Sequence, residues 1–303
     1  MSAAPVPLRF QIGARHLAST HRRLVRVPLS LGDVLAGRLP GLPPLDAGAQ
    51  GYLVTSLRAA DLAALRARCP GMTASLRQRY TRYWIDLTIG LDAYLAQLSA
   101  ATRASIRRKT KRIAKAGGGT LDVRRYRTPA EMADFHAIAR GVSEKTYQHR
   151  LMDSGLPDDP AFVARMIADA AAGLARGWLL FVDAVPAAYL YCPIVGGTVL
   201  YDRVGHDPAS AHFSPGGVLQ LEAMRDLQAD PAALRFDFTE GEGQHKRQFA
   251  TGGEACVDLL LLTPTLANRA LCAALDGFDG IAALGKSTVA ALGLERVAKR
   301  LRR

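Results

Sequence analysis

The chain has 303 residues, of which 49% are apolar and 22% are charged, so it can bury a sizeable core and is not disordered by composition. No apolar run reaches the roughly 20 residues of a membrane span, and the first residues lack the pattern of a signal peptide. The cysteines are widely spaced, without a metal-ligand pattern, which predicts a cytoplasmic protein with reduced thiols and no metal: Cys69, Cys192, Cys256 and Cys272.

The net charge of +12 is concentrated in two patches. Residues 103–115 contain seven Lys or Arg and no acid, and residues 295–303 contain five cations and one acid. The rest of the chain is therefore almost neutral. Such patches suit phosphate-bearing partners of several kinds.

The first third of the chain has mixed local patterns. Residues 1–50 are rich in Pro and Gly and predict short strands and loops. Two segments predict strands, at 52–56 and 80–87, and residues 58–68 predict a helix that stops at Pro70.

A long helix is predicted over residues 91–116, because its apolar residues recur along one stripe. Three glycines, 117–119, end it, since glycine is free to take a positive φ. The apolar positions of the stripe are Leu91, Leu95, Leu98, Ile106 and Ile113.

From residue 121 the pattern becomes alternating α/β, with the order β-α-α-β-β-β-α-β-α-β. Thr128, Pro129 and Glu131 form a capping box at the first helix. The tail, 266–303, predicts two helices broken near 277–280. The expected strands are 121–126, 178–182, 187–194, 198–204, 234–238 and 256–262, and the later helices are 161–175, 218–227 and 244–250.

This order, together with the stretches SPGGVLQLEA, DFTEGEGQHKRQFA and SEKTYQ, resembles the FemAB-like branch of the GNAT acyltransferase superfamily, also called BioF2-like or CelD-like acetyltransferases. The resemblance covers about residues 80–264 and implies an α/β (α+β) GNAT fold with a mixed central sheet. A partial or degenerate GNAT-like unit would precede it. The expected segments are 1–90 for that unit, 91–119 for a basic linking helix, 120–265 for the acyltransferase domain and 266–303 for a helical basic tail.

Ser214, Gly216 and Gly217 form a loop at a helix start, where free N–H groups and the helix dipole can bind phosphates. The alternative is an ordinary helix start with Ser214 as N-cap. By resemblance, this loop binds the pyrophosphate of the donor. The family loop, Arg/Gln-x-x-Gly-x-Gly/Ala, is replaced here by HFSPGG, which leaves acyl-CoA and aminoacyl-tRNA open as donors.

The strand before this loop carries residues that the resemblance places beside the donor. In GNAT folds a backbone N–H near the end of this strand polarises the thioester carbonyl, and Val204 or Gly205 holds that place. Asp202 lies next to it and is a candidate for binding the acceptor. The alternative for Asp202 is a surface ion pair with Arg203.

Four candidates for a general base lie in one short segment: Asp237, Glu240, Glu242 and His245. Acyl transfer to an amine needs a base that removes a proton from the nucleophile, and clustered carboxylates or a histidine have suitable pKa values. Lys246 could neutralise a carboxylate or hold a phosphate of the acceptor. The alternative is a solvated acidic loop in which Glu242 caps a helix.

By resemblance, the end of the first helix of the domain forms an acceptor wall. Lys145, Tyr147 and Gln148 there offer donors, an aromatic face and an amide. The alternative is a helix C-terminus whose lysine complements the dipole.

We therefore expect an enzyme that transfers an acyl group, from acetyl-CoA or another acyl-CoA, to an amine or hydroxyl of a small molecule, sugar or envelope precursor. No Ser or Cys has the setting of a nucleophile, which favours direct attack in a ternary complex. One alternative is a peptide-bond-forming transferase that uses aminoacyl-tRNA, and another is a nucleic-acid or anionic-membrane binding module. The basic tail allows contact with the inner face of the membrane, and no DNA partner is expected.

Overall fold

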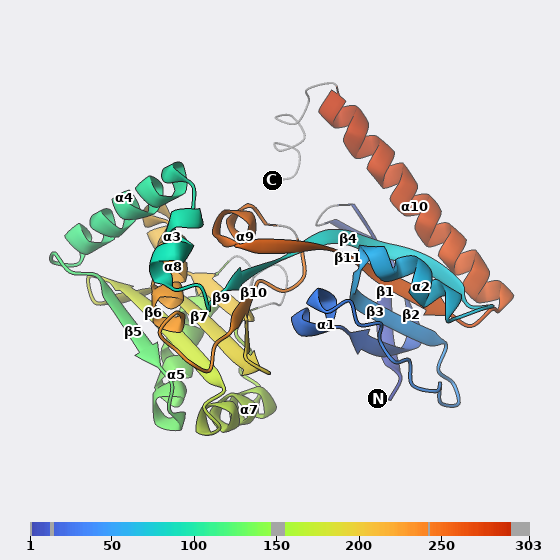
Figure 1. Cartoon of the computed structure of the whole chain (residues 1–303), viewed down its shortest axis with the longest axis horizontal. Helices are drawn as coiled ribbons and strands as arrows, with labels where there is room; N and C mark the ends of the chain where they lie inside the picture. Colours follow the sequence, from blue (N-terminus) through green and yellow to red (C-terminus); the bar gives the residue numbers. More distant parts are fainter. Residues whose placement is uncertain (1, 13–14, 147–154, 242, 292–303) are drawn as a thin grey trace. The chain divides into compact units, whose positions relative to one another are not determined.

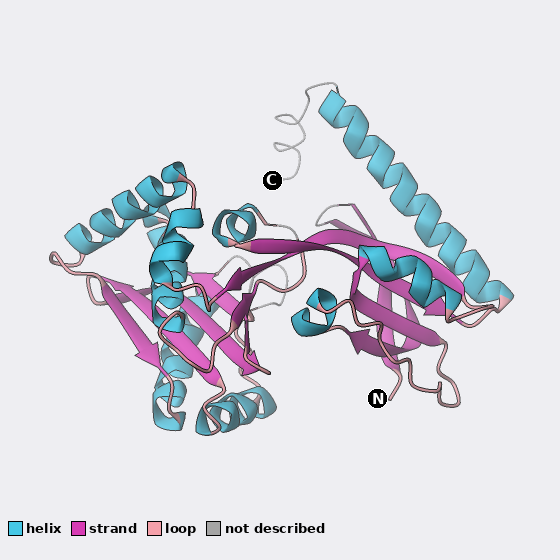
Figure 2. Cartoon of the chain, in the orientation of Figure 1, coloured by secondary structure: helices cyan, strands magenta, loops and turns pink. Residues whose placement is uncertain are grey.

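The computed structural model describes residues 2–12, 15–146, 155–241 and 243–291, with the side chains of the last helix described as far as residue 282. The chain folds into two compact units (Figures 1 and 2). The first unit contains residues 1–81 and 254–303, and the second contains residues 82–253. Strands β4 (Thr73–Asp86) and β11 (Gly252–Leu262) belong partly to each unit.

The four segments expected from the sequence divide the chain differently from these two units. The difference arises because strand pairing groups residues that are distant in sequence: β11 pairs with β3 (Gly51–Arg58). The four-part division stays a prediction about which segments fold independently.

In the first unit, the strand order is β1-β2-β3-β11-β4. Where the sequence predicted short strands and loops, β1 (Ala4–Ile12) and β2 (Arg15–Pro28) form a long antiparallel hairpin. Pro5 and Pro7 are compatible with β1 because it is an edge strand, in which every second N–H points away from β2 and makes no ladder bond.

Helices cover both faces of this sheet. One core cluster contains residues of α1 (Leu31–Leu35) and α2 (Leu62–Ala67), the latter preceded by a 3-10 turn, η1 (Ala59–Asp61). The other contains residues of α10 (Leu266–Ala291).

The predicted break in the tail near residues 277–280 is wrong, because α10 is one helix. Glycine in a helix interior costs only about 0.5–1 kcal/mol. The buried side chains Cys272 and Leu275, which pack on the sheet, offset that cost.

The second unit has the strand order β4-β10-β8-β7-β6-β5, with β9 also paired to β7. The β8–β10 pair is parallel and the other pairs are antiparallel, so the predicted mixed sheet is confirmed. Every residue of β6 is buried. The strands are β5 (Asp122–Tyr126), β6 (Ala175–Val182), β7 (Val185–Val195), β8 (Thr198–Leu200), β9 (Arg203–His206) and β10 (Arg235–Asp237).

Two helical layers enclose this sheet (Figure 1). The predicted capping box of Thr128 and Glu131 is present at the start of α5. None of the described helices has the length and apolar character needed to cross a bilayer. One layer consists of α5 (Pro129–Lys145) and α7 (Pro160–Ala171), and the other of α3 (Leu91–Gln97), α4 (Ala100–Ala116) and α8 (Pro215–Leu227).

The predicted long helix 91–116 is two helices, α3 and α4, separated at Leu98 and Ser99. Ser99 caps α4 by accepting a hydrogen bond from the Thr102 N–H. Arg103 donates to three carbonyls at the end of α3, those of Leu95, Ala96 and Leu98. One of the seven cations therefore has a structural role in joining the two helices.

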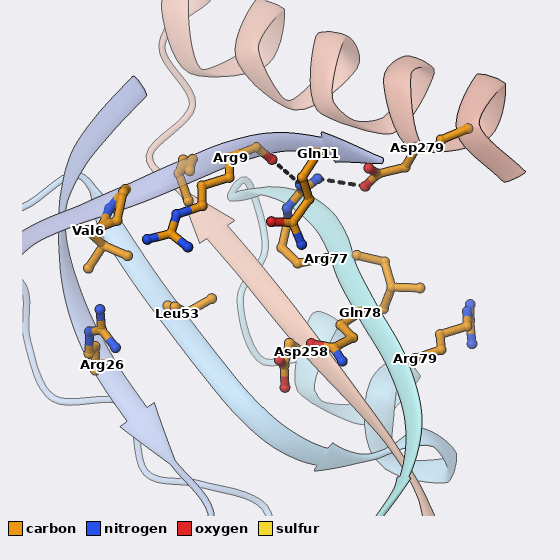
Figure 3. A pocket seen from close by; sticks show the side chains of 14 residues that line it. Val6, Arg9, Gln11, Arg26, Leu53, Arg77, Gln78, Arg79, Asp258 and Asp279 are labelled. Carbon is orange, nitrogen blue, oxygen red and sulfur yellow. Dashed lines mark hydrogen bonds and ion pairs between the residues drawn. The ribbon is translucent and has the colours of Figure 1, made fainter. Parts of the chain in front are cut away.

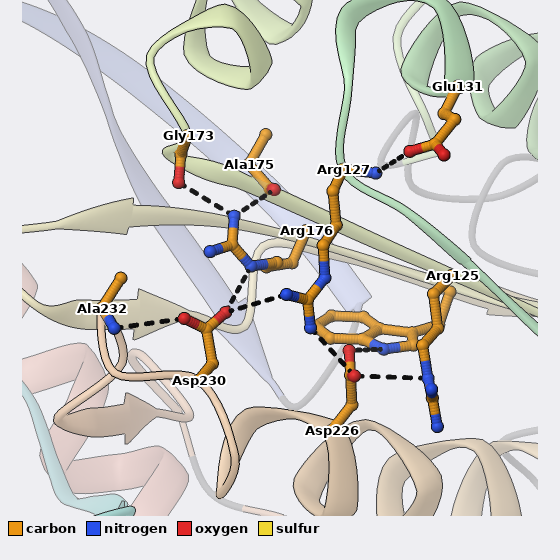
Figure 4. Close-up of polar contacts among 10 residues, drawn as sticks. Arg125, Arg127, Glu131, Gly173, Ala175, Arg176, Asp226, Asp230 and Ala232 are labelled. Atoms are coloured by element: carbon orange, nitrogen blue, oxygen red, sulfur yellow. Dashed lines mark hydrogen bonds and ion pairs between the residues drawn. The ribbon is translucent and has the colours of Figure 1, made fainter.

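The C-terminal end of α8 is held by a network of ion pairs (Figure 4). Asp226 accepts a hydrogen bond of 2.9 Å from the Trp178 indole and pairs with Arg127 at 2.9 Å and with Arg125 at 3.2 Å. Asp230, just beyond the helix, pairs with the buried Arg176 at 2.7 Å. These contacts fix α8 against β5 and β6.

Candidate active site

The sheet of the second unit divides where β8 ends. β8 pairs with β10, but the backbone then bends at Tyr201 and Asp202, and β9 pairs only with β7. The predicted single strand 198–204 is therefore two strands. Among the described strands, none pairs with the outer edge of β9, which we call the open edge.

The register shows which N–H groups face the open edge. Gly205 lies opposite Tyr189, and the Asp207 N–H donates to the Ala187 carbonyl at 2.9 Å. Because bonded and non-bonded pairs alternate in antiparallel ladders, the Gly205 N–H points toward β7. The N–H of Val204 points the other way, toward the open edge.

Gly205 instead has a packing role. A Cβ at this position would lie 2.5 Å from the Tyr189 ring and 2.9 Å from the Thr146 methyl group. Both distances are too short for any side chain, so glycine allows β9 to approach α5 and β7.

The N-terminus of α8 is open. Ser214 has a left-handed backbone (φ +54°) and makes no capping bond through its side chain, so the interpretation of Ser214 as an ordinary N-cap is wrong. Pro215 is the first helical residue. A Cβ at Gly216 or Gly217 would meet no atom within 4 Å. The packing of the chain therefore does not require these glycines, and they leave free space beside the N–H groups of the first turn.

An aromatic cluster containing His245 lies beside the bend between β8 and β9. The His245 ring is 5.9 Å from that of Tyr201 and 6.4 Å from that of Phe238. Partial burial and the neighbouring Lys246 cation lower the pKa of His245. The imidazole is therefore mainly neutral at pH 7, as a general base must be.

Asp237 lies at the end of β10 and is fully buried. Its carboxylate accepts two hydrogen bonds from the Arg82 guanidinium, at 2.5 and 3.2 Å, and one from the Thr239 N–H at 2.8 Å. Since both of its oxygens have donors and Arg82 pairs with its charge, Asp237 is placed to hold the end of the strand.

The loop after β10 holds the remaining base candidates. The Glu240 side chain is exposed, and no described residue pairs with its carboxylate. Lys246 is buried and donates to the Glu240 carbonyl at 2.6 Å, so it supports the loop. Glu242 lies outside the described residues.

The predicted acceptor residues are only partly described. Lys145, at the end of α5, pairs with Asp207 at 3.0 Å, while Tyr147 and Gln148 lie outside the described residues. Asp202 lies in the bend, 3.6 Å from Arg203, and burial raises the pKa of its carboxyl.

The basic helix lies next to the loop that leads into α8. The Arg112 guanidinium is 5.4 Å from the centre of the Phe213 ring, in η2 (Pro208–Phe213). No described acidic side chain pairs with the six cations that remain once Arg103 is set aside: Arg107, Arg108, Lys109, Lys111, Arg112 and Lys115.

Sequence reasoning missed three residues that complete this region: Arg82, Tyr201 and Phe213. Arg82 pairs with a residue 155 positions away, and no local pattern could have indicated this. Tyr201 directly follows a strand and Phe213 precedes the loop, so their places at element ends were the available signal. Within the described part of the chain, no group of three His, Cys, Asp or Glu side chains could hold a metal ion.

Residues 100–247 match the family model described as acetyltransferase (GNAT) domain. This segment of the chain therefore belongs to the GNAT superfamily of acyltransferases, as the sequence patterns indicated. No curated protein matches the sequence significantly.

Solved structures are similar to this chain at low sequence identity. A C-terminal domain of a proposed lysylphosphatidylglycerol synthetase from Agrobacterium fabrum aligns with a TM-score of 0.52 and 14% identity, covering 74% of this chain and 71% of that one. L-PGS from Bacillus licheniformis gives 0.47 and 13%, covering 75% and 72%. FemX gives 0.48 and 12%, covering 72% and 73%. The family match and the first of these likenesses agree with a GNAT fold.

Proposed function

We propose that this protein transfers an acyl group from acyl-CoA, with acetyl-CoA the first candidate, to an amine or hydroxyl of a small molecule, sugar or envelope precursor. The proposal rests on two features that occur together inside a GNAT domain. These are the uncapped N-terminus of α8 and the open edge of β9. The protein leaves polar backbone groups free at both places.

The start of α8 would bind the phosphates of the donor. The N–H groups of Gly216 and Gly217 and the positive end of a 13-residue helix are suited to a pyrophosphate. The free space beside the glycines lets phosphate oxygens come within hydrogen-bond distance of the backbone.

The open edge of β9 would hold the thioester. An N–H aimed at the carbonyl oxygen stabilises the negative charge that develops when the nucleophile attacks, and one such donor contributes about 3 kcal/mol. Because the Val204 N–H faces the open edge, we assign this role to Val204, and Gly205 serves the packing of β9.

The reaction also needs a base for the proton of the acceptor. The acceptor nitrogen or oxygen attacks the thioester carbon, the C–S bond breaks, and CoA leaves as a thiolate, while a base takes the proton of the nucleophile. His245 and Glu240 are the candidates with free side chains. We do not propose Asp237 as the base, because its carboxylate forms an ion pair with Arg82. Glu242 stays a prediction.

The acceptor residues stay a proposal as well. Asp202, in the bend between β8 and β9, and Lys145, at the end of α5, are placed to contact an acceptor, together with Tyr147 and Gln148. Lys246 would contribute indirectly, by holding the loop after β10 through its hydrogen bond to the Glu240 carbonyl.

Calorimetric titration with acetyl-CoA tests the donor. We expect saturable binding, and we expect acetyl-pantetheine, which lacks the nucleotide and pyrophosphate, to bind at least about tenfold more weakly, since phosphate hydrogen bonds contribute about 1.5–3 kcal/mol each. Absence of binding at millimolar acetyl-CoA would contradict the acyl-CoA proposal.

A second candidate function, transfer from aminoacyl-tRNA, is favoured by the charge of α4. Six cations without acidic partners lie on a helix of 17 residues, which is about 25 Å long. Cations spread over that length exceed what the phosphates of one CoA can neutralise, and they suit the backbone of a nucleic-acid helix. Arg112 beside Phe213 brings this charge next to the start of α8.

Filter binding with an aminoacylated tRNA acceptor-stem helix tests this candidate. The triple variant Arg107→Gln, Arg108→Gln, Lys111→Gln should weaken binding and reduce the dependence of affinity on salt by about 2–3 counterions. A matched variant in the first unit, Arg23→Gln, Arg66→Gln, Arg68→Gln, removes the same charge and should have little effect. Equal losses in both variants would contradict a specific role for α4.

A further inference from the structure

The first unit contains a cavity of about 980 Å³ that no part of the proposed transfer uses. It lies on the sheet and is lined by residues of β1, β2, β3, β4, β11 and α10 (Figure 3). This volume is at the upper end of the range for small-molecule sites.

α10 is fixed over one side of this cavity. Phe278 packs edge-to-face on Phe10 with ring centres 5.5 Å apart, and Asp279 pairs with Arg77 at 2.9 Å. The Asp276 carboxylate accepts a hydrogen bond of 2.6 Å from Ser75. The helix therefore closes part of the sheet face and leaves the cavity beside it.

Charges in the cavity are unbalanced. Its two carboxylates are already committed: Asp279 pairs with Arg77, and Asp258 accepts hydrogen bonds from the Ser56 N–H at 3.0 Å and the Tyr80 hydroxyl at 3.2 Å. The other cations of the lining, on three different strands, have no described partner for their guanidinium groups: Arg9, Arg26 and Arg79.

Apolar side chains lie between these cations. Leu53, near the middle of the sheet in Figure 3, lines the cavity and is partly exposed, and Val6 and Leu8 of β1, which belong to the same core cluster, also line it. The cavity thus combines free guanidinium groups from β1, β2 and β4 with an apolar floor.

We propose that this cavity binds an organic phosphate in which a phosphate group is attached to an apolar body. Guanidinium groups donate pairs of hydrogen bonds that match phosphate oxygens. Leu53, with Val6 and Leu8 beside it, would contact the apolar body. The phosphate could belong to a lipid headgroup or to a soluble metabolite, and the test separates these sources.

Calorimetric titration of the full chain with dihexanoyl phosphatidic acid, kept monomeric, and with glycerol 3-phosphate tests the site. Dihexanoyl phosphatidylcholine, with the same chains and no net charge, is the control ligand. The variant Arg26→Gln, Arg79→Gln should weaken binding at least tenfold without changing the far-UV circular dichroism. Arg66→Gln, Arg68→Gln removes the same charge from exposed positions of the first unit and should bind like the wild type.

Tighter binding of phosphatidic acid than of glycerol 3-phosphate would assign the site to a lipid headgroup, and equal binding would assign it to a soluble phosphate. No saturable binding of either at millimolar concentration would overturn the proposal. Equal losses in the two double variants, or equal binding of phosphatidylcholine, would also overturn it. The outcome is independent of acetyl-CoA titration, because all the residues tested belong to the first unit.

Discussion

The two ends of helix α8 differ in how the protein treats their charge. At the C-terminal end, Asp226 lies where the helix dipole disfavours an acid, and the Trp178 indole and two arginines satisfy it. At the N-terminal end, no side chain caps the first turn, and the glycines leave space around it. One end is therefore satisfied by side chains of the protein, whereas the other end keeps free N–H groups, as the proposed binding of an anionic donor requires.

The largest effect is expected at the C-terminal end, from Asp230→Ala. This change leaves the buried Arg176 without its carboxylate, which should lower the free energy of unfolding by about 3–5 kcal/mol. Urea unfolding measures it. Asp122→Ala, which breaks an exposed pair with Arg124, should cost less than about 1 kcal/mol. Similar losses of unfolding free energy in the two variants would contradict a special structural role for the buried pair of Asp230 and Arg176.

The same end predicts a dependence of stability on pH. Burial by itself would raise the pKa of Asp230, but hydrogen bonds from Arg176 and the Ala232 N–H outweigh it and lower the pKa. Asp230 therefore binds its proton more weakly in the folded state than in the unfolded state. Its stabilising contribution is present above about pH 4 and is lost as the pH falls through the folded pKa. The Asp230→Ala variant should lose less stability than the wild type over that range.

Turnover should depend on a base near the aromatic cluster. If His245 or Glu240 takes the proton, replacing that residue by Gln should lower kcat by about a hundredfold or more. Because the pKa of His245 is lowered, the neutral form persists below pH 6.5, and activity carried by His245 should fall only below that pH. An acidic limb that is unchanged in His245→Gln would assign the base elsewhere, and unchanged turnover in both variants would direct attention to Glu242.

The smallest of these effects, and the most selective, is expected at the N-terminal end. Gly217→Val should weaken acetyl-CoA binding about tenfold, because the side chain fills the space for phosphate, while the free energy of unfolding should not fall. Gly141→Val in α5, where a Cβ also meets no atom, is the matched control and should leave affinity unchanged. A loss of stability without a loss of affinity would show that Gly217 is structural.

Sequence patterns predicted much of the fold, because capping and periodicity are local. The capping box at Thr128 and the order of elements after residue 121 follow from neighbouring residues. The breaks in the predicted helix 91–116 and in the predicted strand 198–204 did not follow, since apolar spacing continues across both. Partners distant in sequence, such as Arg82 with Asp237, were also beyond local patterns.

For the candidate site, the sequence predicted which segments carry the site residues better than it predicted the role of each residue. Ser214, Gly216 and Gly217 do lie at a helix N-terminus. Val204 does lie on β9, which pairs with β7 but not with β10, the strand that pairs with β8. Asp237 was expected among the bases, but its burial against Arg82 could not be inferred from a strand pattern.

The central claim is that the N-terminus of α8 and the open edge of β9 hold the acyl donor. A crystal structure of the protein with acetyl-CoA tests it most directly. We expect pyrophosphate oxygens within hydrogen-bond distance of the N–H groups of Gly216 and Gly217, and the thioester oxygen within that distance of the Val204 N–H. Acetyl-CoA bound with its pyrophosphate away from the first turn of α8 would contradict it.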